Sequence, residues 1–186
     1  MKKLFLAGVL AGVLCFGFAA HAEVGCMYDS QHDIVVYNTS KRATSLTNIA
    51  TLDFYKTVTN TNESYYHATV RLTGINEKTK SEPFAMLIVD NKMHKVYPTP
   101  FKKFDVTNGR EAYMLVLDYE IPADLIAKAS AYKSQIGLQI FVDGEKSRIL
   151  TLGAEGNREL KLISKLKYGD YDGVKSGKIA PESAAE

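Results

Sequence analysis

Apolar and polar residues alternate along much of the chain, a pattern typical of half-buried β-strands. The clearest alternation lies between residues 66 and 73. One face of this segment carries Tyr66, Ala68, Val70 and Leu72, and the other carries His67, Thr69, Arg71 and Thr73. The segment therefore predicts a strand with one face against a core and one face in solvent.

Residues 112–133 predict a strand followed directly by a helix. The strand, Ala112–Ile121, is apolar on both faces in its first half, so we expect it to be central and covered on two sides. Pro122 cannot donate a sheet hydrogen bond and is favoured at the first position of a helix. The apolar face of that helix carries Leu125, Ile126, Ala129 and Tyr132.

Residues 136–152 predict a β-hairpin. Its arms are Ile136–Val142 and Lys146–Leu152, joined by Asp143-Gly144. Asp-Gly favours a two-residue hairpin turn because both central positions need positive φ. One face of the first arm carries Ile136, Leu138, Ile140 and Val142.

Four further strands are expected at residues 33–38, 52–58, 84–89 and 93–97. The third of these is apolar on both faces, which favours a central position. Pro98-Thr99-Pro100 interrupts sheet pairing and belongs at an edge or rim.

Two later segments are less regular. Residues 105–109 predict a turn. Residues 157–167 predict either a closing helix capped by Asn157 or a strand through Leu160 and Leu162, and periodicity does not decide between them.

Together these segments give about eight short strands separated by turn signals, with one or two helices near the C-terminus. The sequence therefore predicts an α+β fold that is mainly β. We expect an antiparallel β-sandwich, or a strongly bent sheet, with the helices packed at one end.

The first 22 residues have the features of a secretory signal peptide. A basic start precedes an apolar run at residues 4–18, and Ala20-His21-Ala22 has the small residues of a cleavage site. The run is too short for a transmembrane helix, and no other segment is a candidate. We expect cleavage after Ala22, a periplasmic or secreted location, one β-rich domain at residues 23–168 and a disordered tail at residues 169–186.

Lys2 and Lys3 account for the formal net charge of +2, so removal of the leader leaves a neutral chain. A neutral chain without a basic cluster has no electrostatic footprint for nucleic acid. Cys26 is then the remaining cysteine, which excludes an intramolecular disulfide. It could carry a lipid anchor or an intermolecular disulfide, and we favour a small half-buried side chain in a flexible lead-in.

Three histidines follow the leader: His32, His67 and His94. With Cys26 and Asp29 they could form a mixed metal site, although none has the spacing of a recognised ligand pair. Solvated side chains explain both His67 and His94, and we favour this interpretation over a metal site. We therefore expect no bound cofactor.

Recognised catalytic patterns are missing from the sequence. It contains neither a Gly-x-Ser-x-Gly elbow nor a glycine-rich phosphate loop between a strand and a helix. Asp118 and Glu120 share a strand face and are the nearest approach to paired catalytic carboxylates. A small hydrolase or metal-dependent enzyme would use these acids with His67 or His94, and at least two of the four would meet in one cleft.

The chain has 11 Tyr and no Trp. A groove for a peptide, a glycan or a flat ligand such as haem could be lined by Tyr65, Tyr66, Tyr97, Phe101 and Tyr113. Ordinary packing of tyrosine in β-strands is the simpler interpretation for most of them.

The sequence favours an exported, non-enzymatic protein that binds a protein, peptide or glycan partner through sheet edges or loops. Contacts are expected at Pro98–Pro100 and at Tyr65–Tyr66. The alternatives are the enzyme described above and a carrier of a small apolar or haem-like ligand. A carrier needs a closed apolar cavity of at least roughly 300 Å³, whereas a binding module predicts an open edge or an exposed aromatic patch.

Overall fold

A computed structural model of the chain describes residues 24–40, 43–44, 50–75, 79–99, 102–105, 113–131, 136–142 and 146–179. These residues form two antiparallel sheets and a set of helices, most of them near the C-terminus. The predicted fold class, α+β and mainly β with two antiparallel layers, is confirmed.

The large sheet has seven strands. They are β1 (Val24–Asp29), β2 (Ile34–Thr39), β3 (Ala43–Thr44), β4 (Ala50–Thr59), β5 (Ser64–Ile75), β8 (Lys102–Asp105) and β9 (Tyr113–Ile121). Their order is β1-β2-β4-β5-β9-β8, with β3 paired to β4. Every pair in this sheet is antiparallel, so neighbouring strands present cross-strand side-chain pairs.

The small sheet has four strands. They are β6 (Ser81–Val89), β7 (Lys92–Val96), β10 (Gly137–Val142) and β11 (Lys146–Thr151). Their order is β11-β10-β6-β7, which leaves β11 and β7 at the edges. The predicted central position of residues 84–89 is confirmed, because β6 lies between β10 and β7.

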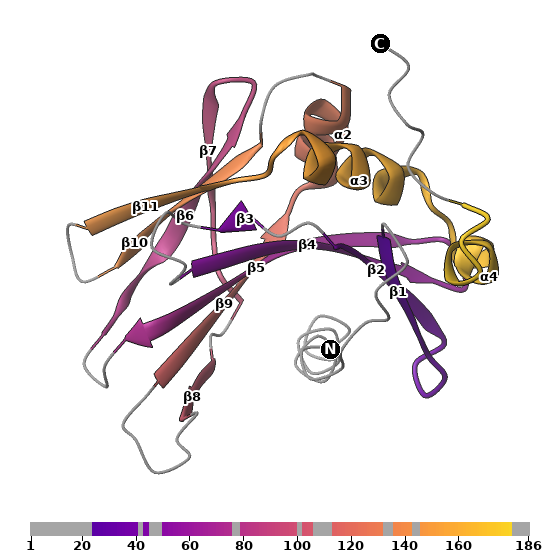
Figure 1. Ribbon diagram of the computed structural model, residues 1–186, viewed down its shortest axis with the longest axis horizontal. Coiled ribbons are helices and arrows are strands. Elements are labelled where there is room, and N and C mark those ends of the chain that lie inside the picture. The colour runs from indigo at the N-terminus through magenta and orange to yellow at the C-terminus, as the bar shows by residue number, and fades with distance from the viewer. Residues whose placement is uncertain are drawn as a thin grey trace.

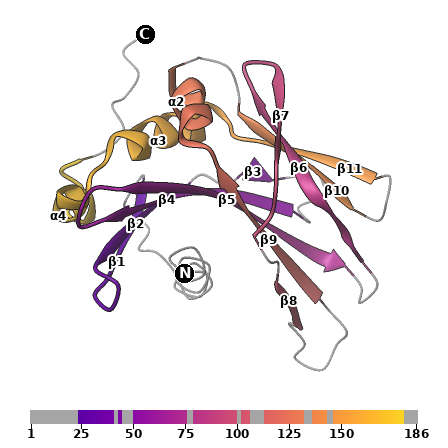
Figure 2. The same ribbon diagram turned by 180° about the vertical axis from the view of Figure 1, so that it is seen from behind.

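The helices are α2 (Ala123–Ala131), α3 (Ala154–Lys165), the 3₁₀ turn η1 (Tyr168–Asp170) and α4 (Tyr171–Lys175). In Figure 1, α2 and α3 lie over one face of the large sheet, and α3 contacts β2 and β4. Figure 2 shows the same arrangement from behind, with α4 beside β1 at one end of the large sheet. No helix among the described segments is long and apolar enough to cross a membrane.

One hydrophobic core joins the two sheets and the helices. The large sheet contributes Leu52, Phe54 and Leu117, the small sheet contributes Leu87 and Leu138, and the helices contribute Ile126 and Ile163. The predicted inward faces are confirmed, since the apolar sets of residues 66–72 and 136–142 are all buried. Burial of this apolar surface is the main favourable contribution to folding.

The predicted strand, helix and hairpin are confirmed as β9, α2, β10 and β11, whereas Tyr132 of the predicted helix lies outside the described residues. The carbonyl of Pro122 accepts hydrogen bonds from the N–H groups of Leu125 and Ile126, so the proline directly precedes the helix. β9 lies between β5 and β8. The Asp143-Gly144 turn lies outside the described residues.

Three strands were not predicted: the two-residue β3, which pairs with β4, and the longer β1 and β8. β1 pairs along its whole length with β2, so Cys26 lies in a strand and the predicted flexible lead-in is wrong. The predicted half-buried state of the Cys26 side chain is confirmed. Similarly, β8 extends to Asp105, where a turn was expected to begin. β1 and β8 are short and mixed in polarity, and they owe their form to a neighbouring strand more than to their own pattern.

The expected disordered tail is wrong for residues 169–179, which include η1 and α4. Val174 is 1% exposed, and Tyr168, Tyr171 and Ile179 pack against the core. These four side chains supply enough apolar surface for the segment to pack, although its overall composition predicts disorder. Residues 180–186 of the predicted tail lie outside the described residues.

Residues 157–165 belong to the helix α3 and not to a strand, and the chain leaves the helix at Leu166. The helix begins one turn earlier than Asn157, with Gly153 in the capping position. The predicted buried stripe of Leu160, Ile163 and Leu166 is confirmed. Glu159 is also buried, and its carboxylate accepts hydrogen bonds from the backbone N–H and the hydroxyl of Ser40 at 2.8 and 2.6 Å.

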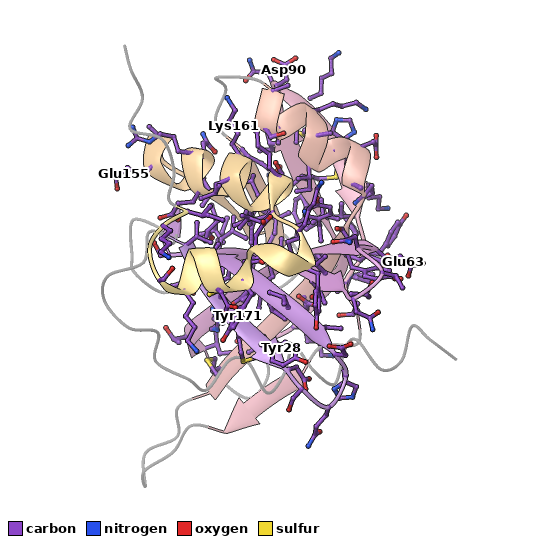
Figure 3. The ribbon with its side chains drawn as sticks, turned by 90° about the vertical axis from the view of Figure 1, so that its right-hand side faces the viewer. Tyr28, Glu63, Asp90, Glu155, Lys161 and Tyr171 are labelled. Atoms are coloured by element: carbon purple, nitrogen blue, oxygen red, sulfur yellow. The ribbon has the colours of Figure 1, made fainter. Side chains whose placement is uncertain are left out.

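The C-terminal helices are attached to the large sheet by polar contacts as well as apolar ones. The hydroxyl of Tyr37 donates to the carbonyl of Lys167 at 2.7 Å. Tyr168 donates to the carboxylate of Asp33, which also accepts from Tyr28 at 2.9 Å. In Figure 3, Tyr28 on β1 and Tyr171 on α4 lie close together, and their ring centroids are 6.0 Å apart.

We expect Val174→Asp to lower the free energy of unfolding by about 2–4 kcal/mol, because it places a carboxylate in an apolar contact. Urea denaturation would measure the change. Lys178→Asp is the matched control, since Lys178 is exposed in the same segment. Equal effects from the two variants would show that the segment does not dock on the core in solution.

Lys56 is a buried cation on the core side of β4. Its ammonium donates to the carbonyls of Ser164 and Leu166 at 2.9 and 2.5 Å, at the C-terminal end of α3. A cation there satisfies carbonyls that have no partner within the helix and opposes the negative end of the helix dipole. Burial lowers the pKa of Lys56 from its usual 10.5 to about 8, with Asp170 acting in the opposite direction.

The free energy of unfolding should therefore rise between pH 8 and about pH 9.5 through Lys56. In this window the unfolded chain still binds the proton that the folded chain has released, and stability rises with pH wherever the unfolded state binds more protons. The upper limit of pH 9.5 lies below the range in which the buried Tyr37 and Tyr119, whose pKa values are raised, act in the opposite sense. The pKa of Cys26 is also raised from 9.0, so Cys26 opposes the rise within the window, in the parent protein and in a Lys56 variant alike.

Urea denaturation at several pH values would measure this slope. In Lys56→Met the free energy of unfolding should rise less with pH. At pH 7 it should fall by about 1–3 kcal/mol, because two carbonyls lose their hydrogen-bond donor. Lys128→Met, at an exposed lysine of α2, should keep the slope. A Lys56→Met slope equal to that of the parent protein would contradict the assignment.

Candidate functional site

The outward face of the large sheet holds a buried His–Asp pair. Nδ1 of His67 on β5 lies 2.9 Å from Oδ2 of Asp118 on β9. The other carboxylate oxygen accepts from the hydroxyl of Thr69 at 2.8 Å, and Thr99 donates to Oδ2 at 3.2 Å. Two strands and the connection after β7 therefore fix the carboxylate from three sides.

His67 is 4% exposed, so the expected solvated side chain is wrong. Its strand is flanked by β4 and β9, and Tyr55 lies directly across from it on β4. On the same face the guanidinium of Arg71 forms an ion pair with Asp53 and donates to the hydroxyl of Tyr55 at 3.0 Å. These polar side chains are therefore paired with one another, whereas the buried Thr57 Oγ1 on the same face has no hydrogen-bond partner among the described residues.

Two of the four residues proposed for an enzyme therefore meet, namely His67 and Asp118. Glu120 lies further along the same strand and is exposed, while His94 lies on β7 of the small sheet. A metal site would need further ligands. Within the described ranges, no group of three His, Cys, Asp or Glu side chains is placed to hold a metal ion.

The other predicted metal ligands lie at the opposite end of the large sheet. His32 lies in the turn after β1, with Nδ1 2.7 Å from the carboxylate of Asp29. The thiol of Cys26 faces the C-terminal segment, and burial raises its pKa, which disfavours the thiolate that both metal binding and nucleophilic attack require.

The predicted aromatic groove is divided between different surfaces. Tyr66 faces the core and its hydroxyl donates to the carbonyl of Ser164 at 3.3 Å. Tyr65 lies on the opposite face of β5 and donates to Glu63 at 3.1 Å. Tyr97 is 61% exposed beside the small sheet. Phe101 and the side chain of Tyr113 lie outside the described residues.

The outer face of the small sheet carries a set of apolar side chains directed away from the core. We call it the apolar face, and it comprises Phe84, Met86, Ile88, Met93, Tyr97, Phe141 and Ile149. Met93 is 59% exposed and Ile149 is 53% exposed, one on each edge strand. The side chains on the central strands are half-buried.

β6 explains why this face is unusual. Its inward side chains, Ala85, Leu87 and Val89, are buried in the core. Its outward side chains are also apolar, yet no helix of the described chain lies over them (Figure 1). Strands that are apolar on both faces are typical of sheets covered by a layer on each side. Among the described residues, the core covers one side of this sheet and no helix layer covers the other.

Aromatic rings and one lysine organise the centre of the apolar face. The ring centroids of Phe84 and Phe141 are 5.2 Å apart at an interplanar angle of 45°. The ammonium of Lys95 lies 4.2 Å from the centroid of Phe84 and 5.5 Å from that of Tyr97. Lys95 therefore covers part of the apolar surface with its stem while its charge stays near solvent.

A hollow of about 570 Å³ lies beside α4, lined by Asp172, Gly173, Lys175, Ser176 and Lys178. Most of its lining side chains are charged or polar, and it opens to solvent. A carrier of a small apolar ligand would need a closed apolar cavity instead.

Comparisons with known proteins give no relative: no family model, no curated protein and no solved structure matches the chain. The two surfaces described above must be judged on their geometry.

Sequence reasoning named His67, Asp118 and Tyr97 but not the apolar face as a unit. The signal that could have found this face was the two-sided apolar pattern at residues 84–89. That pattern predicts a central position in a sheet, and it is equally typical of a sheet that a second layer covers.

We expect Asp118→Asn to lower the free energy of unfolding by about 1–3 kcal/mol, because it removes acceptor capacity from three donors, of which His67 and Thr69 are buried. Thermal or urea unfolding would measure the loss. Glu120→Gln, two residues away and exposed, is the control and should change stability by less than about 0.5 kcal/mol. A neutral Asp118→Asn would mean that the network does not support the sheet.

Proposed function

We propose that this chain is an exported, non-enzymatic envelope protein that binds a partner protein through the apolar face of its small sheet. The observation that carries the proposal is the apolar outward side of β6, half-buried and without a covering layer in the described chain. Export rests on the predicted leader, and the periplasmic or secreted location follows from it.

Burial of such a surface favours association. Apolar surface removed from water contributes roughly 25 cal/mol per Å², and contiguous exposed patches of several hundred Å² are typical of interaction sites. The composition also fits, because aromatic residues and methionine are enriched in the centres of protein interfaces. Met86 and Met93 can adapt their shape to a partner.

The His67–Asp118 pair supports a second candidate, an enzyme that uses acid–base chemistry. A carboxylate at Nδ1 would orient the imidazole and leave Nε2 for a substrate. However, His67 is buried, and the described neighbours of Asp118 are donors that fix it structurally. We therefore favour the binding module. Loss of an activity in His67→Gln with unchanged stability would favour the enzyme instead.

Site-specific photo-crosslinking in the producing cell tests the binding surface. A photoreactive amino acid at position 93 or 149 should give the same discrete adduct, because these positions lie on opposite edges of one face. The same group at Lys161, which is exposed on α3, is the control. The adduct formed from position 93 should disappear when Ile149→Asp is added.

Adducts that are as abundant from position 161, or no adduct from either edge of the apolar face, would overturn the proposal. Circular dichroism of Ile149→Asp would show whether the variant remains folded, which we expect because Ile149 is more than half exposed.

A further inference from the structure

The outward face of the large sheet carries a second group of buried apolar side chains. Ile34 and Val36 on β2 pack with Tyr55 on β4 and with the half-buried Met27 on β1. The alternate residues of β2 belong to the main core, so this group lies on the opposite side of the sheet from the helices. With Thr57, which pairs with Val36 in register, we call these five side chains the concave strip.

The side chains of the concave strip are packed as in a covered sheet. Val36 is 1% exposed, Tyr55 is 3% exposed and Thr57 is 0% exposed. However, no described helix or strand lies over this side of the sheet (Figures 1 and 2). If the leader is removed on export, as the proposed function requires, it cannot cover the strip in the mature protein. The strip is then available to another molecule.

Thr57 is the polar group of the strip. Its Oγ1 is buried and has no hydrogen-bond partner among the described residues, which is unfavourable for a hydroxyl. The hydroxyls of Tyr55 and Tyr65 on either side already have partners at 3.0 and 3.1 Å. An ordered water needs about two to four polar partners, and Val36 flanks Thr57 with an apolar side chain. A ligand hydroxyl held in place by an apolar tail needs only Thr57.

The size of the strip favours a small molecule over a protein. Protein interfaces bury roughly 800 Å² and about 20–30 residues on each partner, whereas the apolar part of the strip consists of four side chains. Asp29 on β1 and Asn38 on β2 bound it at opposite ends. The strip also lies on the concave side of a curved sheet, which a flat bilayer cannot follow (Figure 1). These limits match a single aliphatic chain.

The charges on this face disfavour a charged head group. Arg71 is ion-paired with Asp53, and His67 lies against Asp118. The described outward side chains of β1, β2, β4 and β5 include no other cation that could meet a carboxylate or phosphate. An ammonium would likewise find each carboxylate of these four strands already bonded. Burial of an unpaired charge is strongly unfavourable, so a neutral head group fits best.

We therefore propose that the concave strip binds a neutral single-chain lipid of the monoacylglycerol type. A hydroxyl of its head group bonds Oγ1 of Thr57, and either hydroxyl can be the donor. Its aliphatic chain lies over Val36, Ile34 and Met27. This site is distinct from the apolar face of the small sheet, so a lipid and a partner protein can be bound at the same time.

Three probes with tails of equal length test the head group with the exported form of the protein. Monolauroylglycerol is neutral, laurate is anionic and dodecyltrimethylammonium is cationic. The intact mass of the protein would first show that the leader is absent. Titration below the micelle concentration, followed by amide chemical shifts, would give affinity and location. We expect monolauroylglycerol to bind at β1, β2 and β4, about tenfold more tightly than either charged probe.

Two variants separate the head group from the tail. Thr57→Val should weaken binding of monolauroylglycerol about tenfold, with little effect on the charged probes and no fall in Tm, because no hydrogen bond within the described chain is lost. Met27→Gln should weaken all three probes by a similar factor of about three, since they share the tail. Thr51→Val, further along the same face of β4, is the control and should bind as the parent protein does.

Equal affinity for laurate and monolauroylglycerol would overturn the proposal, as would a Thr57→Val variant that binds monolauroylglycerol like the parent protein. Chemical-shift changes at β6 and β7 in place of β2 and β4 would also contradict it, because the lipid would then occupy the apolar face. A leader still present in the intact mass would contradict export and the proposal with it. Crosslinking from positions 93 and 149 is independent of these results, so the proposed function can fail while lipid binding holds, and the reverse.

Discussion

The burial of one apolar face of each strand in a shared core is the constraint on which the rest of the structure depends. Side chains alternate with a period of two, so once Ala68, Val70 and Leu72 of β5 point inward, His67, Thr69 and Arg71 must point outward together. The same alternation on β9 places Asp118 outward. The polar network on the large sheet is therefore a consequence of how the core is packed, and a register shift of one residue would destroy both.

The fold could be predicted from sequence where a segment's own pattern decides its structure. β5, β9, α2 and β10 each have a clear periodicity and a turn or proline at their boundary. β1 and α4 have neither, and they form because they contact each other and the core. Cys26 in β1 and Val174 in α4 are examples of residues whose environment depends on segments about 150 positions apart, and no local pattern records such a contact.

The candidate site, too, could be predicted from the sequence only in part. His67 and Asp118 could be named as chemically capable residues, but their meeting depends on the register between β5 and β9. In that register Thr69, and not His67, lies directly opposite Asp118, and His67 reaches the carboxylate diagonally. The pairing of Arg71 with Asp53 depends likewise on the register between β4 and β5. The positions of these residues in the sequence do not specify either register.

The outward faces of the two sheets differ in how far their side chains find partners within the chain. On the large sheet, the outward polar groups His67, Asp118, Arg71 and Asp53 have hydrogen-bond or ion-pair partners within the chain. On the small sheet, Phe84, Met86 and Ile88 face outward, and the described chain offers them one another and the stem of Lys95. Apolar side chains cannot pair by hydrogen bonds, and they are removed from water only when another apolar layer packs against them. For this reason the small sheet, and not the histidine, is where a second molecule would gain most by binding.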